Sequence, residues 1–371
     1  MKKLVVLQGI LCILLCYFCI KIANTCMEES KPYQEDRTYE KVRILIRNQN
    51  TQEEDYRGKI RIKRTEDGRE KINEVSLEEY LYGVVGSEMP SSYPEEALKA
   101  QAVCARSYAV CRMQNPASGQ YDMDDTTSFQ VYSPENETDA VRNAVDETKG
   151  EILSYEGMPA ETFFFSTSCG LTTDANVFNQ KGGEYPYIVS QAVGYGGNPN
   201  SKEDFTKEDV FRNYILGDSE DAFESGEKWF RWSTTVRLDQ IEAEGLKKGS
   251  VKEVNVLDRG PGGVVSRLSV SDGKNMVEIE GEYRVRCLLA QAAGELSLND
   301  GTETACASLL PSAYFIIENT EDENEVRICG GGYGHGAGMP QNAAKAMAEQ
   351  GMDYREILAF FFEDTKLTTL G

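Results

Sequence analysis

The chain has 371 residues, enough for one large domain or two smaller domains with a sizeable buried core. It carries 39 Lys and Arg against 61 Asp and Glu, which gives a formal net charge of −22 and argues against a nucleic-acid partner. The hydrophobic fraction of 40% argues against a disordered chain. A single histidine, His335, excludes mechanisms that require two imidazoles, including His-rich metal triads.

The ten cysteines do not form a disulfide framework. Cys12, Cys16 and Cys19 lie in an apolar N-terminal run, which leaves seven elsewhere, an odd number that excludes complete intrachain pairing. Cys104 and Cys111 are separated along an expected helix by roughly 10 Å, too far for a disulfide. We therefore expect most cysteines to be small buried hydrophobic residues.

The N-terminus predicts a membrane anchor. Lys2 and Lys3 precede an apolar run over residues 4–23, close to the ~20 residues that a helix needs to cross a bilayer. No Ala-x-Ala cleavage site follows, so an uncleaved anchor is favoured over a removed signal peptide. The positive-inside rule places Lys2 and Lys3 in the cytoplasm. We predict a single-pass cell-membrane protein with a charged stalk at 24–40 and an extracytoplasmic body at 41–371.

The body begins with strand patterns and then turns helical. Val42, Ile44 and Ile46 alternate with polar residues, and the pattern resumes at residues 60–62, which predicts two strands. The sequence Ser76-Leu-Glu-Glu is a capping box that predicts a helix ending at Gly86.

A second helix is expected from Ser92, with Pro94 and Glu95 in its first turn. It is apolar on most sides, so we expect it to be central and buried.

The rest of the body mixes blocks of strands with helices. Strands are expected at residues 151–155, 161–165, 251–257, 264–270, 276–279, 314–317 and 325–329. The last part is helical, with one helix at 341–350 and another capped by Asp353. Because the two kinds of element are segregated, the predicted fold class is α+β. The polar, acidic stretch 198–228 is the best candidate for an insertion or a mobile flap.

Glu88 is the first candidate for chemistry. It follows the apolar run that ends at Gly86, in the sequence Gly-Ser-Glu-Met-Pro between the two expected helices. A carboxyl group held at such a junction loses water, which raises its pKa toward that of a general acid. The alternative is an exposed glutamate in an interhelical loop.

Lys99 and Arg106 lie seven residues apart, on one face of the expected central helix. Two cations on a largely apolar helix need anionic partners or a groove in which to meet them. They either line a binding groove or form structural ion pairs with carboxylates of the body.

Three loops have the composition of binding sites. Residues 125–132 (DTTSFQVY) and 166–170 (STSCG) present short hydrogen-bonding side chains, and residues 330–338 hold six glycines. The glycine-rich loop lacks a P-loop lysine, so we expect it to approach a ligand or another loop instead of a phosphate. His335, within it, is either a site residue or a hydrogen-bonded core residue. The predicted substrate contacts in these loops are Gln130, Tyr132, Ser166, Ser168 and His335.

Together these segments resemble the stage II sporulation protein D family, membrane-anchored cell-wall enzymes that share a domain with amidase-enhancer proteins. The resemblance runs from about Lys41 to Leu367 and rests on YLYGVVGSEMP (80–90), PEEALKAQAVCARSYAV (94–110), DTTSFQVY (125–132), FSTSCG (165–170) and GGYGHGAGMPQNAAKAMAEQGMDYREIL (331–358).

The resemblance implies a lytic transglycosylase that acts on peptidoglycan glycan strands, preferably strands stripped of stem peptides. Such an enzyme cleaves between N-acetylmuramic acid and N-acetylglucosamine and leaves 1,6-anhydro ends. The resemblance further implies a role in spore engulfment, in a complex with other wall enzymes such as an amidase. It makes Glu88 the catalytic acid and base, Arg106 a substrate-groove residue, and Lys99 a weaker substrate contact.

The sequence departs from the family where some members bind zinc. Ser128 and Phe129 stand where those members carry His and Cys, Phe165 replaces another His, and Cys169 replaces a Gly. We therefore predict neither a metal nor a cofactor. Two alternatives remain: a non-catalytic glycan-binding module that stimulates a partner amidase, and a vegetative wall-remodelling enzyme with the same chemistry.

Overall fold

The computed structural model describes residues 39–48, 51–65, 68–178, 185–194, 203–217 and 221–370. Within this part the fold is mixed α+β with seven α-helices, which confirms the predicted class. The expected anchor at 4–23 and most of the expected stalk lie outside the described residues. No helix among the described residues is both long enough and apolar enough to span a membrane.

The first hydrophobic core begins with a four-stranded sheet in the order β2-β3-β1-β4. Val42 and Ile44 on β1 are fully buried, which confirms the alternation expected there. β3 runs antiparallel to both β1 and β2, and the short β4 runs parallel to β1. The strands are β1 (Lys41–Ile46), β2 (Lys59–Thr65), β3 (Gly68–Ser76) and β4 (Met123–Asp124).

Helix α2 (Leu77–Glu88) begins where its capping sequence predicts, since the Ser76 hydroxyl accepts a hydrogen bond from Glu79 N at 3.3 Å. The prediction that it ends at Gly86 is wrong, because the helix continues to Glu88. A Cβ at Gly86 would collide with the carbonyl oxygen of Asn136. The glycine thus allows a close approach of two backbones, and it brings Glu88 onto the helix itself.

Helix α3 (Glu95–Gln114) is the central buried helix that the sequence predicts. It begins at Glu95 and not near Ser92, because Pro94 occupies the cap position. Its neighbours in the first core include α2, α4 (Asp139–Glu147), and the C-terminal helices.

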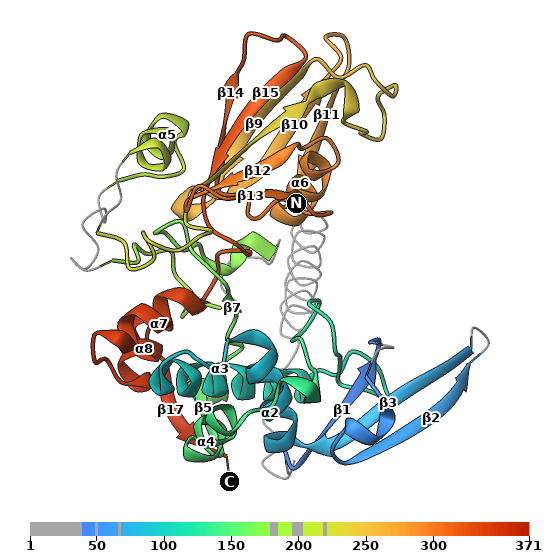
Figure 1. Ribbon diagram of the computed structural model, residues 1–371, viewed down its shortest axis with the longest axis vertical. Helices are drawn as coiled ribbons and strands as arrows, with labels where there is room; N and C mark the ends of the chain where they lie inside the picture. The colour runs from blue at the N-terminus through green and yellow to red at the C-terminus, as the bar shows by residue number, and fades with distance from the viewer. Residues whose placement is uncertain are drawn as a thin grey trace, which may run out of the picture. The chain divides into compact units, whose positions relative to one another are not determined.

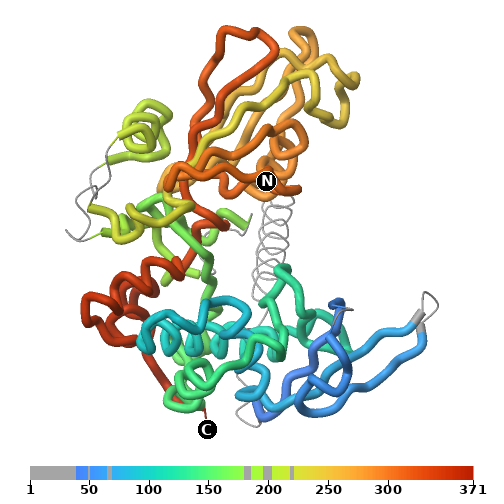
Figure 2. Tube along the Cα trace, viewed as in Figure 1, coloured from blue at the N-terminus to red at the C-terminus, as the bar shows by residue number. Residues whose placement is uncertain are grey.

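The C-terminal part of the chain returns to this core. In Figures 1 and 2 the helices α7 (Gln341–Glu349) and α8 (Tyr354–Phe361) lie beside α3. The Asp353 capping box is formed with Glu356, as predicted. A small antiparallel sheet completes this part, with β17 (Lys366–Thr369), β5 (Glu151–Tyr155) and β6 (Met158–Pro159).

The first core therefore combines residues 42–193 with residues 337–362. A short parallel pair joins the two stretches. It consists of β7 (Phe164–Phe165) and β16 (Met339–Pro340), so the strand expected at 161–165 is much shorter than predicted. Short 3₁₀ turns are η1 (Glu53–Asp55), η2 (Pro134–Asn136), η3 (Ala175–Phe178), η4 (Leu238–Gln240) and η5 (Pro261–Gly263).

The second core is built on a three-stranded sheet, β11-β10-β9, and a five-stranded sheet, β13-β12-β8-β15-β14. Five of these strands were predicted, whereas β8, β12, β13 and the helix α6 were not. The elements are β8 (Trp232–Arg237), β9 (Glu253–Arg259), β10 (Val265–Ser271), β11 (Met276–Glu280), α6 (Glu282–Ala290), β12 (Glu295–Leu298), β13 (Glu303–Ala305), β14 (Phe315–Asn319) and β15 (Glu325–Gly330).

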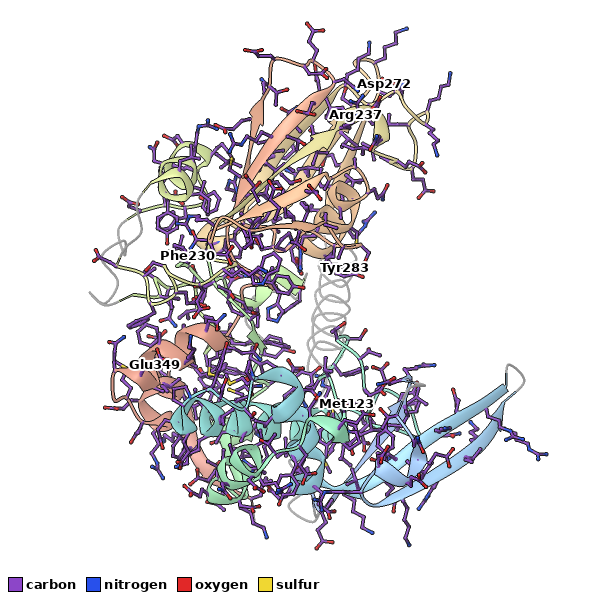
Figure 3. All side chains as sticks on the ribbon, in the orientation of Figure 1. Met123, Phe230, Arg237, Asp272, Tyr283 and Glu349 are labelled. Carbon is purple, nitrogen blue, oxygen red and sulfur yellow. The ribbon has the colours of Figure 1, made fainter. Side chains whose placement is uncertain are left out.

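The segment 198–228 contains more structure than the expected flap. Its described part includes helix α5 (Glu208–Leu216), whose Phe211 and Ile215 are buried in the second core. Among the side chains in Figure 3, Met123 is buried in the first core, whereas Tyr283 on α6 is exposed.

The cysteines of the described residues follow the prediction in part. All six are free thiols, as expected; Cys104, Cys111 and Cys169 are buried, whereas Cys287, Cys306 and Cys329 are only partly buried.

Candidate functional site

Glu88 is held at the C-terminal end of α2 by two hydrogen-bond partners. Its Oε1 accepts a hydrogen bond from the backbone N–H of Val131 at 2.8 Å, and its carboxyl group also contacts the Gln341 side chain. Burial raises the pKa of Glu88 above its ordinary value, although both hydrogen bonds oppose this rise. A carboxyl group that keeps its proton more readily than an exposed glutamate suits a general acid.

The loop that binds Glu88 also lines a pocket, whose wall does not include Glu88 itself. Gln130 is 1% exposed and forms part of the wall of a cavity of about 300 Å³. We call this cavity the aromatic pocket; its wall consists of Tyr108, Arg112, Thr127, Ser128, Phe129, Gln130, Glu161, Thr162, Phe163, Phe164, Phe178, Tyr185 and His335. The structure thus brings two of the predicted contact residues, Gln130 and His335, into one pocket, which the Val131 loop connects to Glu88.

His335 is both a pocket residue and a fully hydrogen-bonded one. Its Nδ1 accepts a hydrogen bond from Ala337 N at 3.2 Å, which leaves Nε2 to donate to the carbonyl oxygen of Phe164 at 3.0 Å. Burial lowers the pKa of His335 to about 4, so the ring is neutral near pH 7. The imidazole therefore offers a ring face to the pocket and is not available as an acid or base.

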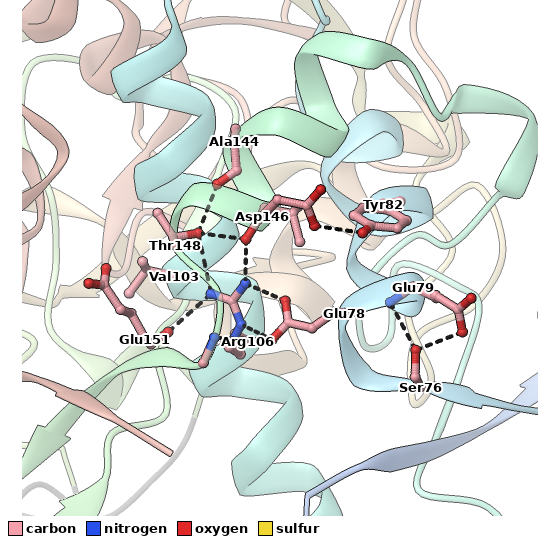
Figure 4. Close-up of polar contacts among 12 residues, drawn as sticks. Ser76, Glu78, Glu79, Tyr82, Val103, Arg106, Ala144, Asp146, Thr148 and Glu151 are labelled. Atoms are coloured by element: carbon pink, nitrogen blue, oxygen red, sulfur yellow. Dashed lines mark hydrogen bonds and ion pairs between the residues drawn. The ribbon is translucent and has the colours of Figure 1, made fainter. Parts of the chain in front are cut away.

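Arg106 forms a structural ion pair, which is one of the two alternatives that the sequence left open. Its side chain is fully buried and forms a two-pronged ion pair with Glu78, with Nε–Oε1 at 2.9 Å and Nη2–Oε2 at 2.7 Å (Figure 4). The other donors reach the carbonyl oxygens of Val145 and Glu151 and the Thr148 hydroxyl. Every nitrogen of the guanidinium is thus engaged within the protein, which leaves none for a glycan.

Lys99 is engaged in the same way. Its Nζ lies 2.7 Å from Glu95, 3.0 Å from Glu96 and 2.7 Å from Glu147. Burial opposes the charged form, but the hydrogen bonds to these three carboxylates outweigh it and raise the pKa of Lys99. The predicted substrate contact is therefore a structural ion-pair centre in this structure.

Tyr132 is also a core residue. It is 2% exposed, its hydroxyl donates to the Asn73 side chain at 3.0 Å, and its ring packs 4.9 Å from that of Tyr80. Gly83 on α2 lies against this ring, where a Cβ would collide with it. Tyr132 therefore positions the loop that carries Gln130 and Val131.

Ser166 and Ser168 lie on a polar network that reaches α7. Asn342 N donates to the Ser166 carbonyl oxygen at 3.0 Å, and the preceding residue, Gln341, contacts Glu88. Ser166 is partly exposed, whereas Ser168 is 1% exposed. The network thus places the Ser166 loop near the catalytic candidate and turns Ser168 inward.

Ser168 is hydrogen-bonded to a buried carboxyl group that the sequence did not predict. Glu224 is fully buried, its Oε1 accepts from Ser168 N at 3.0 Å, and its Oε2 is bonded to the Ser168 hydroxyl. Burial raises the pKa of Glu224 to about 8, although its bonds to Ser168 oppose the rise. No sequence pattern marks this contact, because 56 residues separate the two partners.

We expect Glu224 to make stability fall with rising pH. Its pKa lies above the ordinary value of 4.5, so its contribution is complete below pH 4.5 and is lost as pH rises through about 8. Between these limits the free energy of unfolding should fall by up to about 1.4 kcal/mol per pH unit from this group. Urea unfolding from pH 4.5 to 8.5 should show this difference between the wild type and Glu224→Gln. Parallel curves for the two proteins would contradict the assignment.

The residues at the family's zinc positions do not fit a metal in this chain. Ser128 and Phe129, which stand at those positions, supply no nitrogen or sulfur ligand, and the described residues hold no group of three or more His, Cys, Asp or Glu arranged to bind a metal ion. Burial raises the pKa of the Cys169 thiol to about 11, which keeps it protonated.

We therefore expect the purified protein to lack stoichiometric zinc and to keep its melting temperature after treatment with a chelator. Elemental analysis together with thermal unfolding tests this expectation. About one zinc per chain would contradict it, and Cys169 would then be the first ligand to examine.

A family match covers the segments around Glu88. The family described as "Stage II sporulation protein" matches residues 65–155, and a domain of unknown function matches residues 175–338. The first match contains α2, α3 and the loop that binds Glu88. The second covers most of the second core.

Curated relatives match most of the chain. It is 27% identical over 311 residues to the amidase enhancer of Bacillus subtilis, covering 78% of this chain but only 40% of that protein. It is 30% identical over 295 residues to an uncharacterized protein of Brachyspira hyodysenteriae, covering 78% of this chain and 66% of the relative. It is 28% identical over 313 residues to stage II sporulation protein D of Bacillus subtilis, covering 80% and 76%. The chain thus carries a stage II sporulation protein match at residues 65–155 and is similar to stage II sporulation protein D and to the amidase enhancer over most of its length.

Proposed function

We propose that this protein is a lytic transglycosylase that cleaves peptidoglycan glycan strands, preferably strands stripped of stem peptides. The observation that carries the proposal is the partly buried Glu88 carboxyl group, which has a raised pKa and is hydrogen-bonded to a loop that lines an aromatic pocket. The position of Glu88 within the stage II sporulation protein match supports it. A glycan with few formal charges also suits a chain with a net charge of −22.

Glu88 can supply both proton transfers of this reaction. Its protonated carboxyl group donates to the oxygen between N-acetylmuramic acid and N-acetylglucosamine as the bond from C1 to that oxygen breaks. The C6 hydroxyl of the same muramyl sugar then bonds to C1 and returns its proton to Glu88. The products are a 1,6-anhydro end and a free hydroxyl, and Glu88 is regenerated. A single carboxyl group suffices because no water attacks, unlike in the usual two-carboxylate hydrolases.

Mass spectrometry of the products from stripped glycan strands tests this proposal. The intramolecular attack should produce anhydromuramyl ends, which are lighter than hydrolysed ends by one water, about 18 Da. Reducing muramyl ends would indicate hydrolysis instead, and intact strands would leave the protein without this activity. Either of the last two results would overturn the proposal.

A second candidate function is stimulation of a cell-wall amidase without catalysis. It is favoured by the 27% identity to a protein named amidase enhancer. A purified amidase incubated with intact peptidoglycan should then work faster in the presence of this protein, and Glu88→Gln should stimulate it equally. Loss of stimulation in that variant would instead tie the effect to cleavage.

We also propose a sporulation role at the cell membrane, with residues 4–23 as a single-pass anchor and the body outside the cytoplasm. The apolar run after Lys2 and Lys3 supports the anchor, and the names of the sporulation relatives support the role. Fractionation of cells that produce the full chain, followed by protease treatment of intact protoplasts, tests the placement. A soluble cytoplasmic product would contradict it.

A further inference from the structure

Helix α7 has no capping side chain at its own N-terminus. Pro340 occupies the cap position and makes no side-chain hydrogen bond to the helix. The first backbone N–H groups of a helix need acceptors from outside the helix. Here the Ser166 carbonyl oxygen accepts from Asn342 N at 3.0 Å, and the Glu224 carboxyl group accepts from Ala343 N. Glu224 therefore caps α7 from a distant part of the chain.

Glu224 also holds the loop against which α7 begins. Its Oε1 accepts from Ser168 N at 3.0 Å, and its Oε2 is bonded to the Ser168 hydroxyl, which in turn accepts from Gly170 N at 3.0 Å. In the same loop the Thr167 hydroxyl accepts from Asn342 Nδ2 at 2.9 Å. Because Glu224 is fully buried, water does not compete for its hydrogen bonds. One carboxyl group thus fixes both the loop and the start of the helix.

The link between Glu224 and α7 does not depend on charge. Among the described residues, Glu224 forms no ion pair; Lys345 on α7 is paired with Glu227 instead, at 2.8 Å. Burial, together with the neighbouring Glu227 carboxylate, raises the pKa of Glu224 to about 8, so the carboxyl group is largely neutral near pH 7. Glu224 therefore serves α7 as a hydrogen-bond acceptor, a part that an amide of the same size can also fill.

The start of α7 carries a residue that meets the proposed acid. The Gln341 side chain contacts the Glu88 carboxyl group, and its Nε2 also donates to Gln101 Oε1 on α3 at 3.4 Å. The neighbouring Asn342 accepts a hydrogen bond from the hydroxyl of Tyr93, which lies in the loop that follows Glu88. A displacement of this end of α7 would therefore move the groups that surround Glu88.

We propose that Glu224 is a positioning residue for the reaction: it caps α7 and so holds Gln341 against Glu88, without touching the glycan. Glu224 lies in the stretch 175–338 that matches a domain of unknown function, so this stretch contributes to the chemistry of the first core. The role in catalysis rests on the proposed function, since it takes Glu88 as the acid. The cap itself does not, because it consists of contacts within the protein.

Three variants of Glu224 separate its hydrogen bonds from its charge. Glu224→Gln keeps an acceptor and the size of the neutral acid, so it should cleave stripped strands within about twofold of the wild-type kcat. Glu224→Leu loses the acceptors, so kcat should fall about 10–100-fold while KM stays within about threefold, because a small misplacement of catalytic groups is costly. Glu224→Asp withdraws the carboxyl group by one methylene and should lose kcat as well, which keeps the test available if Glu224→Leu does not fold.

A double variant shows whether Glu224 acts through Gln341. Glu224→Leu combined with Gln341→Leu should cleave at about the rate of Gln341→Leu alone, since the two changes remove the same contact with Glu88. Both single variants should shift the decline of kcat to higher pH, because the Gln341 hydrogen bond lowers the pKa of Glu88. Glu282→Leu is the matched control: it removes a carboxyl group that is 6% exposed on α6 and should keep the wild-type kcat per folded molecule.

Hydrogen exchange tests the cap without requiring cleavage. In Glu224→Leu the amides of Asn342 and Ala343 should exchange about tenfold faster than in the wild type, whereas Glu282→Leu should leave them unchanged. Unchanged exchange in Glu224→Leu, wild-type kcat in its folded Leu and Asp variants, or losses that multiply in the double variant would each overturn the role of Glu224. If the amides respond as expected but the wild type releases no anhydro ends, the proposed function fails and the cap stands.

Discussion

Glu88→Gln is expected to abolish the release of 1,6-anhydro ends while leaving the fold and glycan binding intact. The amide keeps the size of the carboxyl group and can still accept a hydrogen bond from Val131 N, but it has no proton to transfer. General acid and base catalysis contributes about 10²–10⁴-fold to rates of this kind, so the loss should be at least of that order. Product release from stripped strands, followed over time, measures it.

A matched control for this variant is Glu349→Gln on α7, an exposed position with the same change of charge. It should cleave at the wild-type rate. The raised pKa of Glu88 also predicts that the wild-type rate declines as pH rises and the carboxyl group loses its proton. Cleavage by Glu88→Gln at near the wild-type rate would remove Glu88 from the mechanism.

Arg106→Met should produce the largest loss of stability among these variants, about 3–5 kcal/mol, which is typical when one partner of a buried ion pair is removed. Glu78 would keep a largely buried carboxylate without its cation, because its side chain is only 19% exposed. The carbonyl oxygens of Val145 and Glu151 would also lose a donor each. Denaturant unfolding measures the loss.

Two further variants separate a structural role from a substrate contact. Arg106→Lys keeps the charge but loses the planar fork, so it should also be destabilised, and activity per folded molecule should remain in both variants. The double variant Arg106→Met with Glu78→Leu should recover part of the lost stability, since it removes both charges together. An unchanged melting temperature with lost cleavage would restore Arg106 as a substrate ligand.

The elements that the sequence predicts best are those specified by neighbouring residues. The caps at Ser76 and Asp353 are local patterns, and both helices begin where they indicate. The helix end predicted at Gly86 was wrong because the sequence does not distinguish two kinds of glycine. One kind ends a helix, and the other lies within a helix and allows another backbone to approach closely. Only the contact with Asn136, which lies 50 residues further along, distinguishes them.

The sequence predicted part of the site. For Glu88, between two apolar segments, it left a desolvated carboxyl group and an exposed loop glutamate as alternatives, and the structure favours the first, because burial raises the pKa of Glu88. The roles of Arg106 and Lys99 could not be predicted, because a cation on an apolar helix is typical both of a binding groove and of a buried ion pair. In the structure both side chains form ion pairs with carboxylates of the protein. The burial of Glu224 could not be predicted, since nothing near it in the chain specifies Ser168 as its hydrogen-bond partner.

The division of the first core between two distant stretches of chain determines when the site can form during synthesis. Val193 and Ala337, the last and first core residues of those stretches, lie 144 positions apart (337 − 193). At ~5–20 residues per second, ribosomes need roughly 7–29 s to make that segment. Throughout this interval α3 lacks α7 and α8, and Glu88 lacks Gln341. Until translation has passed α7, a nascent chain therefore carries Glu88 without the Gln341 contact that helps to position it.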